Sequence, residues 1–227
     1  MRKLAWTAWA LAMLAVAPDL SARESSRAKE EPVRNVIYMI GDGMGLTHVS
    51  MMMLEEGYRP TSFDRSQNVA LITTYSANNR VTDSAAAGTA LASGRKTNNG
   101  MLGMTPDGET FESMMEKAME EGWKAGLVVT VYLQHATPAA FYAHVPSRND
   151  LDEISEQFVE SGVDVAFGGG KKFLAAERGD GKTLIDELKA KDYRVVYDLQ
   201  EADAVDQGRI VGLFSRASPL STRPSPP

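Results

Sequence analysis

The sequence predicts an α/β fold in which a mostly parallel central sheet is flanked by helices. Strand-like and helix-like segments alternate from residue 33 onward, which is the pattern of a parallel sheet with helical crossovers. Several strand segments are nearly continuous in apolar residues, as in strands covered on both faces. The most polar and glycine-rich loops follow strand segments, at 41–45, 134–137 and 168–170. Ligand sites of such sheets form in these loops.

The expected strands are short apolar segments rich in β-branched residues. In chain order they are 33–40 (VRNVIYMI), 68–74 (NVALITT), 124–131 (KAGLVVTV), 163–170 (VDVAFGGG), 193–198 (YRVVYD) and 209–214 (RIVGLF).

Helical segments separate these strands. The expected helices are 46–56, 85–93, 110–123 and 182–191. In the third, the spacing of apolar residues places one set on a single helical face, namely Phe111, Met114, Met115, Ala118 and Met119. Pro138 suits the first turn of a further short helix.

Composition restricts the class of protein. A chain of 227 residues with 43% hydrophobic residues is long enough for one large domain or two small ones. The net charge of −6 argues against a general nucleic-acid binder. The absence of cysteine from the sequence excludes disulfides, thiolate metal sites and a cysteine nucleophile.

The first 22 residues have the pattern of a signal peptide. Arg2 and Lys3 precede an apolar run over 4–17 that is too short to span a membrane comfortably. We expect cleavage after Ala22 and export to the periplasm or the extracellular space. A retained anchor helix is the alternative.

Three further segments follow the signal peptide. Residues 23–32 are polar and predict a flexible lead-in, and residues 33–214 carry the α/β domain. Residues 215–227 contain four prolines and no hydrophobic periodicity, which predicts a disordered tail.

Asp42 lies between two glycines directly after a predicted strand. Glycines let the backbone turn sharply, so the carboxylate is well placed to hold a hard cation at the sheet edge. The alternative is a turn aspartate that caps the following helix.

Ser84 lies in the segment VTDSAAAGTALASG, residues 81–94. Thr82 and Asp83 are both good N-cap residues, so Ser84 falls in the first helical turn. There the helix dipole favours a phosphate or a serine alkoxide. The small residues that follow would let the helix pack closely under such a site. The alternative is a capped, tightly packed helix without chemistry.

The segment QHATPAAFYAHVPSR supplies three further candidates: His135, Thr137 and Arg148. An arginine fork matches two phosphate oxygens, and a threonine hydroxyl is a weak ligand for Mg²⁺. A solvent-exposed arginine and an N-cap threonine are the alternatives.

Three segments, NVIYMIGDGMG, VTDSAAAGTALASG and HATPAAFYAHVPSR, together closely resemble alkaline phosphatase, and the resemblance runs from about Asn35 to about Phe214. It implies hydrolysis of small phosphate monoesters with two Zn²⁺ and one Mg²⁺, and a homodimer for the complete enzyme. Ser84 matches the serine that is transiently phosphorylated, Arg148 the arginine that clamps the phosphate, and Asp83 the residue that helps to position this arginine.

The same resemblance implies the metal ligands. Asp42 matches the carboxylate that bridges the second zinc and the magnesium, Ser84 a zinc ligand, and Thr137 a magnesium ligand. His135 falls at a position beside the magnesium. We expect it to contact the ligands of this ion without binding the ion itself.

The family needs further aspartate, histidine and glutamate ligands from a C-terminal half. The histidines here are His48, His135 and His144, and none follows Arg148. We therefore expect a truncated product with incomplete zinc sites and little activity of its own. The final strand, 209–214, would then expose an edge or an apolar face and lower the solubility.

Two other function classes stay open. One is a non-catalytic module that binds phosphate or Mg²⁺ through Asp42, Thr137 and Arg148. The other is a related serine hydrolase or a sulfatase-like enzyme, although the TDSAAAGTA context around Ser84 argues against a sulfatase.

Overall fold

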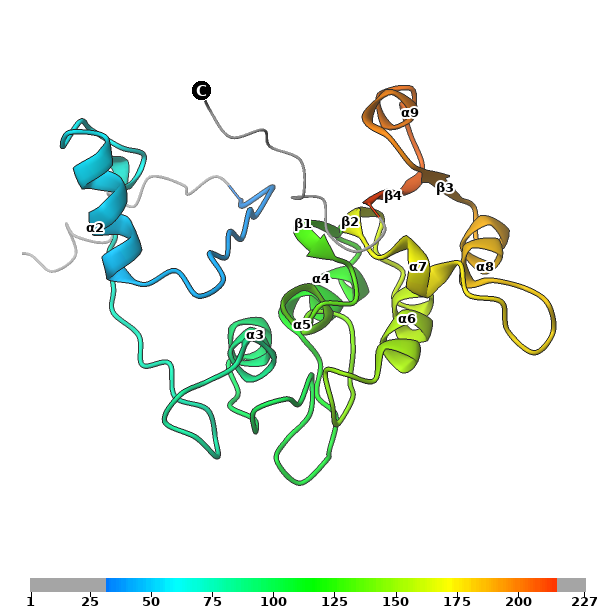
Figure 1. The fold of residues 1–227 in the computed structure, drawn as a ribbon, viewed down its shortest axis with the longest axis horizontal. Coiled ribbons are helices and arrows are strands. Elements are labelled where there is room, and N and C mark those ends of the chain that lie inside the picture. Colours follow the sequence, from blue (N-terminus) through cyan, green and yellow to red (C-terminus); the bar gives the residue numbers. More distant parts are fainter. Residues whose placement is uncertain (1–31, 216–227) are drawn as a thin grey trace, which may run out of the picture. The chain divides into compact units, whose positions relative to one another are not determined.

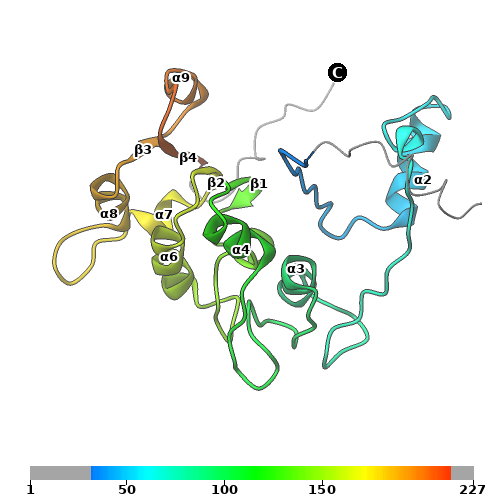
Figure 2. The same ribbon diagram turned by 180° about the vertical axis from the view of Figure 1, so that it is seen from behind.

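The computed structural model describes residues 32–215, drawn as the coloured ribbon in Figures 1 and 2. The described residues belong to two units, with residues 32–41 in the smaller and residues 42–215 in the larger. The predicted signal peptide, nearly all of the predicted lead-in and the predicted tail beyond residue 215 lie outside the described residues. Within 32–215, no helix combines the length and the apolar character needed to cross a bilayer.

A four-stranded parallel sheet forms the centre of the larger unit. Its strands are β1 (Gly126–Tyr132), β2 (Val165–Gly169), β3 (Tyr193–Val196) and β4 (Arg209–Ser215). Their order across the sheet is β1-β2-β4-β3. The predicted α/β class and the predicted parallel pairing are confirmed.

The last strand is central, so the expectation that it would expose an edge or an apolar face is wrong. β4 pairs with β2 on one side and with β3 on the other. Ile210, Val211 and Leu213 are buried. The error arises because the order of strands along the chain does not determine their order in space when crossovers connect them. The outer strands of this sheet are β1 and β3.

Helices and one short 3₁₀ segment occupy the connections. They are α2 (Leu46–Glu55), η2 (Phe63–Arg65), α3 (Ser84–Ser93), α4 (Met114–Glu120), α5 (Ala136–Ala139), α6 (Leu151–Glu160), α7 (Lys171–Leu174), α8 (Leu184–Ala190) and α9 (Leu199–Asp203). The helices predicted at 46–56, 85–93 and 182–191 are confirmed. α3 packs beside α5 and α6 packs beside α8, and the first pair is seen in Figure 1.

The helix predicted over 110–123 is shorter than expected. It begins at Met114 because Ser113 caps it, with the Ser113 hydroxyl accepting the Glu116 N–H and the Glu116 carboxylate accepting the Ser113 N–H. Phe111 therefore precedes the helix instead of lying on its apolar face.

The strands predicted at 33–40 and 68–74 are not formed. Among residues 32–215, no β-ladder includes either segment. In the first segment Ile37 and Met39 are 86% and 89% exposed, and in the second Val69 and Leu71 are 87% and 81% exposed. An apolar run becomes a strand only where its N–H and C=O groups meet a partner strand.

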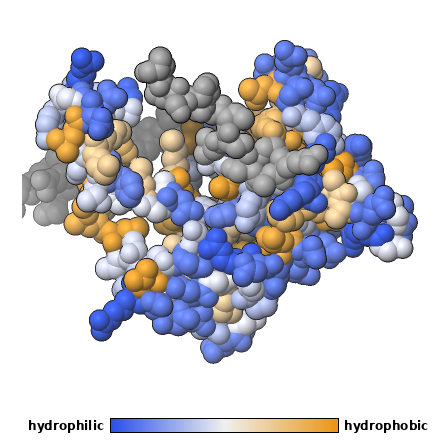
Figure 3. Space-filling view, in the orientation of Figure 1, coloured by the Kyte–Doolittle hydropathy of each residue, from blue (hydrophilic) through white to orange (hydrophobic). Residues whose placement is uncertain are grey.

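Hydrophobic residues also gather at the surface of α2, which buries none of its side chains. Figure 3 shows such residues in orange. Exposed apolar surface favours association between molecules, so low solubility stays a prediction, with these segments and α2 as its source instead of β4.

Small residues let α3 approach α5 closely. Ala85 and Ala86 are buried on α3, and a Cβ placed on Gly88 would lie 3.0 Å from the Ala140 Cβ. The predicted close packing of the alanine-rich helix is confirmed.

We expect Gly88→Val to lower the free energy of unfolding by about 1–3 kcal/mol, because the added atoms would push α3 away from α5. Helix propensity alone would change stability the other way, since glycine is the poorer helix former. Urea unfolding followed by circular dichroism measures the change. Ala90→Val, at a position on α3 that is not buried, is the matched control. A Gly88→Val variant as stable as the wild type would contradict close packing here.

Candidate active site

The Asp83 carboxylate lies at the start of α3 and accepts three hydrogen bonds. Its donors are the Ala86 N–H at 2.9 Å, the Gly100 N–H at 3.0 Å and the Arg148 Nη1 at 3.2 Å. Of the two N-cap candidates, Asp83 is therefore the cap, and the chain enters the helix in an extended conformation. This places Ser84 at the first helical position, within the first turn as predicted.

Ser84, Asp42 and Thr137 converge, as their predicted roles require. The Ser84 hydroxyl donates to Asp42 Oδ1 at 3.1 Å, and the Thr137 hydroxyl donates to Asp42 Oδ2 at 2.7 Å. Asp42 comes from the turn before α2, where Gly43 adopts a positive φ of 70°. Oxygen atoms from three separate segments therefore meet at one carboxylate.

The structural alternatives for Asp42 and Thr137 are not observed. α2 is capped by Gly45 without a side-chain hydrogen bond, so Asp42 is not its cap. The N-cap of α5 is His135, and Thr137 lies inside that helix. Both side chains instead bond to residues far away in the sequence.

Arg148 is held in place from several sides. Besides the ion pair with Asp83, its Nη2 lies 3.3 Å from His135 Nε2, and its backbone N–H donates to the Gly100 carbonyl at 2.7 Å. Its side chain is 25% exposed, which contradicts a purely solvent-exposed arginine. The guanidinium is thus oriented while its side chain stays partly accessible to solvent.

The surroundings of His135 favour the neutral imidazole. Burial lowers its pKa below the ordinary 6.5, and the positive charge of Arg148 lowers it further, against a smaller opposite effect of Asp42. Its Nε2 faces a guanidinium, which can only donate, so Nε2 carries the lone pair. Its Nδ1 is buried and has no hydrogen-bond partner among the described residues.

The oxygen cluster fits some metals better than others. One carboxylate and two hydroxyls are hard ligands that suit Mg²⁺. Zinc prefers nitrogen and sulfur ligands together with carboxylates. Within residues 32–215, no group of three or more histidine, cysteine, aspartate or glutamate side chains could hold a metal. The described residues therefore fit Mg²⁺ and only part of a zinc site.

The family model described as "Alkaline phosphatase" matches residues 33–219. The chain belongs to the alkaline phosphatase family. The family predicted from the three segments around Asp42, Ser84 and Arg148 is thereby confirmed, and the match covers most of the chain.

Individual alkaline phosphatases extend this comparison. The chain is 36% identical to "Alkaline phosphatase 4" of Bacillus subtilis (strain 168), a match that covers 87% of this chain and 46% of the relative. A cold-active alkaline phosphatase from Shewanella sp. has a similar structure, with a TM-score of 0.72 and 34% identity over 79% of this chain and 45% of that one. The chain thus spans about half the length of the relatives it matches.

A metal-bound alkaline phosphatase is also similar. It is a variant of the enzyme from the Antarctic bacterium TAB5 with Mg bound in its M3 site. The TM-score is 0.70, and the identity is 30% over 78% of this chain and 51% of that one.

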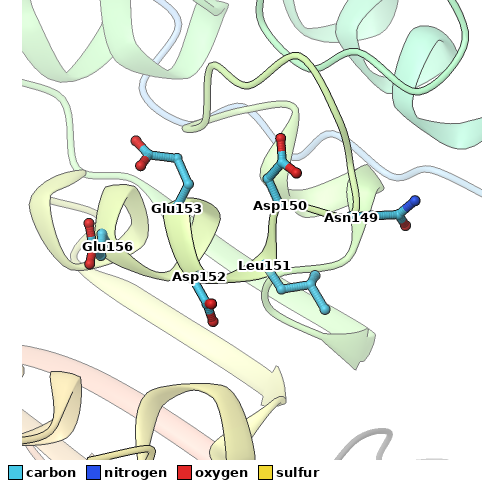
Figure 4. Close-up of a pocket in the computed structure, with 6 residues that line it drawn as sticks. All are labelled: Asn149, Asp150, Leu151, Asp152, Glu153 and Glu156. Carbon is cyan, nitrogen blue, oxygen red and sulfur yellow. The ribbon is translucent and has the colours of Figure 1, made fainter. Parts of the chain in front are cut away.

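A shallow acidic hollow lies outside this cluster of oxygen ligands and the arginine (Figure 4). Its lining contains none of the predicted site residues, and four of its six members carry carboxylates that would repel a phosphate dianion. The residues that line it are Asn149, Asp150, Leu151, Asp152, Glu153 and Glu156.

Sequence reasoning missed the pairing of His144 with Glu116, although the capping motif that contains Glu116 was readable. His144 Nε2 lies 2.8 Å from Glu116 Oε1, and Nδ1 lies 2.9 Å from the Gly103 carbonyl oxygen. Both ring nitrogens thus face acceptors, which favours the doubly protonated imidazolium. This pairing joins α4 to the segment that leads into Arg148.

The pairing raises the pKa of His144 and lowers the pKa of Glu116. The bond to Glu116 raises the pKa of His144 above its ordinary 6.5, although burial opposes the shift. Burial works to raise the pKa of Glu116, but the bonds from His144 and Ser113 outweigh it and leave this pKa below the ordinary 4.5.

We expect Glu116→Gln to cost stability most between pH 4.5 and 6.5, by about 1 kcal/mol, because both partners are then charged. The difference from wild type should shrink as pH rises above 6.5 through the raised pKa of His144, which loses its proton. It should also shrink as pH falls through the lowered pKa of Glu116.

Denaturant unfolding across this pH range tests the pair. The control is Glu120→Gln, an exposed position on the same helix. A loss of stability in Glu116→Gln that does not change with pH would mean that the ion pair is not formed.

Proposed function

We propose that the chain carries the nucleophile and the phosphate-binding arginine of a phosphate monoester hydrolase. Ser84 Oγ would attack phosphorus, form an O–P bond and expel the alcohol, which takes up a proton. Water would then attack the phosphoserine, release inorganic phosphate and regenerate the serine. The observation that supports this most is the convergence of Ser84, Asp42 and Thr137 beside the Asp83–Arg148 pair.

Each of these side chains has a distinct task. Asp42 accepts the Ser84 hydroxyl proton in a hydrogen bond and so orients the oxygen. The start of α3 favours negative charge on that oxygen and on an incoming phosphate. Arg148, held by Asp83, offers its planar fork to two phosphate oxygens.

We further propose the metal ligands that the resemblance implies. Asp42 and Thr137 would hold Mg²⁺, Asp42 and Ser84 would contribute to one of two Zn²⁺ sites, and His135 would lie behind them. When bound, these cations neutralise the phosphate dianion and lower the pKa of the serine hydroxyl.

A second candidate function is binding of phosphate and Mg²⁺ without turnover. It is favoured by the lack, within 32–215, of any cluster of metal-binding acidic, histidine or cysteine side chains. For this reason we expect the 227-residue polypeptide on its own to turn over slowly.

We also propose that the protein is exported and acts on small phosphate monoesters; homodimerisation of the complete enzyme stays an expectation.

We expect the wild-type chain, given p-nitrophenyl phosphate with Zn²⁺ and Mg²⁺, to form phosphoserine at Ser84 and release p-nitrophenol. Ser84→Ala should reduce release by about a thousandfold or more, because it lacks the nucleophilic oxygen. Mass spectrometry of the acid-quenched protein locates the adduct.

Ser93→Ala, at the other end of the same helix, is the matched control and should keep the adduct. A phosphoryl group on another residue, or none at all, would contradict nucleophilic catalysis by Ser84. Phosphate binding without an adduct would support the second candidate.

We expect Asp42→Asn to weaken Mg²⁺ binding at least about tenfold, because the neutral amide cannot attract the cation as the carboxylate does. Isothermal titration with MgCl₂ measures the affinity. Asp107→Asn, in an exposed turn, removes the same charge and should leave the affinity unchanged. Equal affinities in both variants would place the magnesium site elsewhere.

A further inference from the structure

The backbone that leads into Ser84 is held by a side chain from another loop. Asn99 Oδ1 accepts the Asp83 N–H at 3.2 Å, and Asn99 Nδ2 donates to the Val81 carbonyl at 2.9 Å. One amide thus binds the main chain on both sides of Thr82. Its orientation is unambiguous, since the oxygen faces a donor and the nitrogen faces an acceptor.

The neighbouring residue extends the connection to the arginine. The Gly100 N–H donates to the Asp83 carboxylate at 3.0 Å, and the Gly100 carbonyl accepts the Arg148 N–H at 2.7 Å. Gly100 has a positive φ of 88°, which glycine adopts without strain. Asn99 and Gly100 therefore bind the nucleophile helix and the arginine segment from adjacent positions.

The loop that carries Asn99 is itself anchored on its other side. The Asn99 N–H donates to Asn78 Oδ1 at 2.9 Å, and the Ala77 N–H donates to the Thr97 carbonyl at 2.8 Å. Thr97 is fully buried. Because the loop is fixed at both ends, the Asn99 amide can restrain the position of Asp83 instead of following it.

We propose that Asn99 is a positioning residue for phosphoryl transfer. Its amide sets the entry of the chain into α3, and thereby the relative placement of Ser84, Asp83 and the Arg148 guanidinium. Asn99 itself does not bond to Ser84 or to the guanidinium of Arg148. This inference rests on the proposed function.

The adjacent asparagine offers a matched control. Asn98 and Asn99 are both partly buried. In the described part of the chain, the Asn98 side chain forms no hydrogen bond. The backbone carbonyl of Asn98 accepts the Met101 N–H. Replacing either residue by alanine removes the same atoms from the same loop.

The first measurement is the affinity for inorganic phosphate in the presence of Zn²⁺ and Mg²⁺, by isothermal titration well below the melting temperature. We expect Asn99→Ala to weaken binding about tenfold, since small displacements of binding groups have large effects, and Asn98→Ala to bind as the wild type does. Both variants should melt within a few degrees of each other. A lower melting temperature for Asn99→Ala with unchanged phosphate affinity would show a merely structural role and overturn the proposal.

The second measurement needs no bound ligand. Amide hydrogen exchange at Asp83, followed by NMR, should be about tenfold faster in Asn99→Ala than in Asn98→Ala, because the Asp83 N–H loses its acceptor. Equal exchange rates would overturn the role of Asn99. A wild-type chain that binds no phosphate would contradict the proposed function, so the two failures are distinguishable.

Discussion

The Asp83 carboxylate lies between two positively charged groups and offsets the repulsion between them. The N-terminal end of α3 carries the positive end of the helix dipole, and the Arg148 guanidinium lies beside it at 3.2 Å from Asp83 Oδ2. This carboxylate accepts hydrogen bonds from the Ala86 N–H and from Arg148. Its negative charge therefore stabilises the helix start and the guanidinium side by side, next to Ser84. A phosphate that approached the serine would therefore meet favourable charge from the helix and from the arginine together.

Small side chains make this arrangement sterically feasible. Ala85, Ala86 and Gly88 leave room for α5 to approach α3, and α5 carries the Thr137 hydroxyl that bonds to Asp42. A bulky residue at these positions would separate the two helices and, with them, the oxygens that surround Asp42. The alanine-rich composition of α3 is thus both a packing feature and a condition for the site.

Much of the fold follows from patterns within short windows. The parallel strands β1 to β4 and the helices α2, α3 and α8 were predictable from apolar periodicity and caps. The segments 33–40 and 68–74 have the same strand-like pattern, yet a strand also needs partners, which no local window contains. α6 went unpredicted, although Ile154 and Phe158 lie on one buried helical face.

The candidate site also combines residues that the local sequence reveals with one that depends on contacts distant in the sequence. Asp42, Ser84, Thr137 and Arg148 lie in recognisable motifs, and the structure brings them together with Asp83. Asn99 acts through hydrogen bonds to backbone groups 16 and 18 residues away. Such bonds leave no periodic trace and no composition bias, so only the three-dimensional structure reveals them.

The central place of β4 has a consequence for biosynthesis. Among residues 32–215, β3 pairs with no strand except β4, so a chain under synthesis can add β3 to the sheet only after the interval in which the residues from Tyr193 to Ser215 are made. At ordinary translation rates this interval lasts on the order of seconds. Until β4 is available, the edge of β2 that β4 covers in the folded sheet has no partner strand.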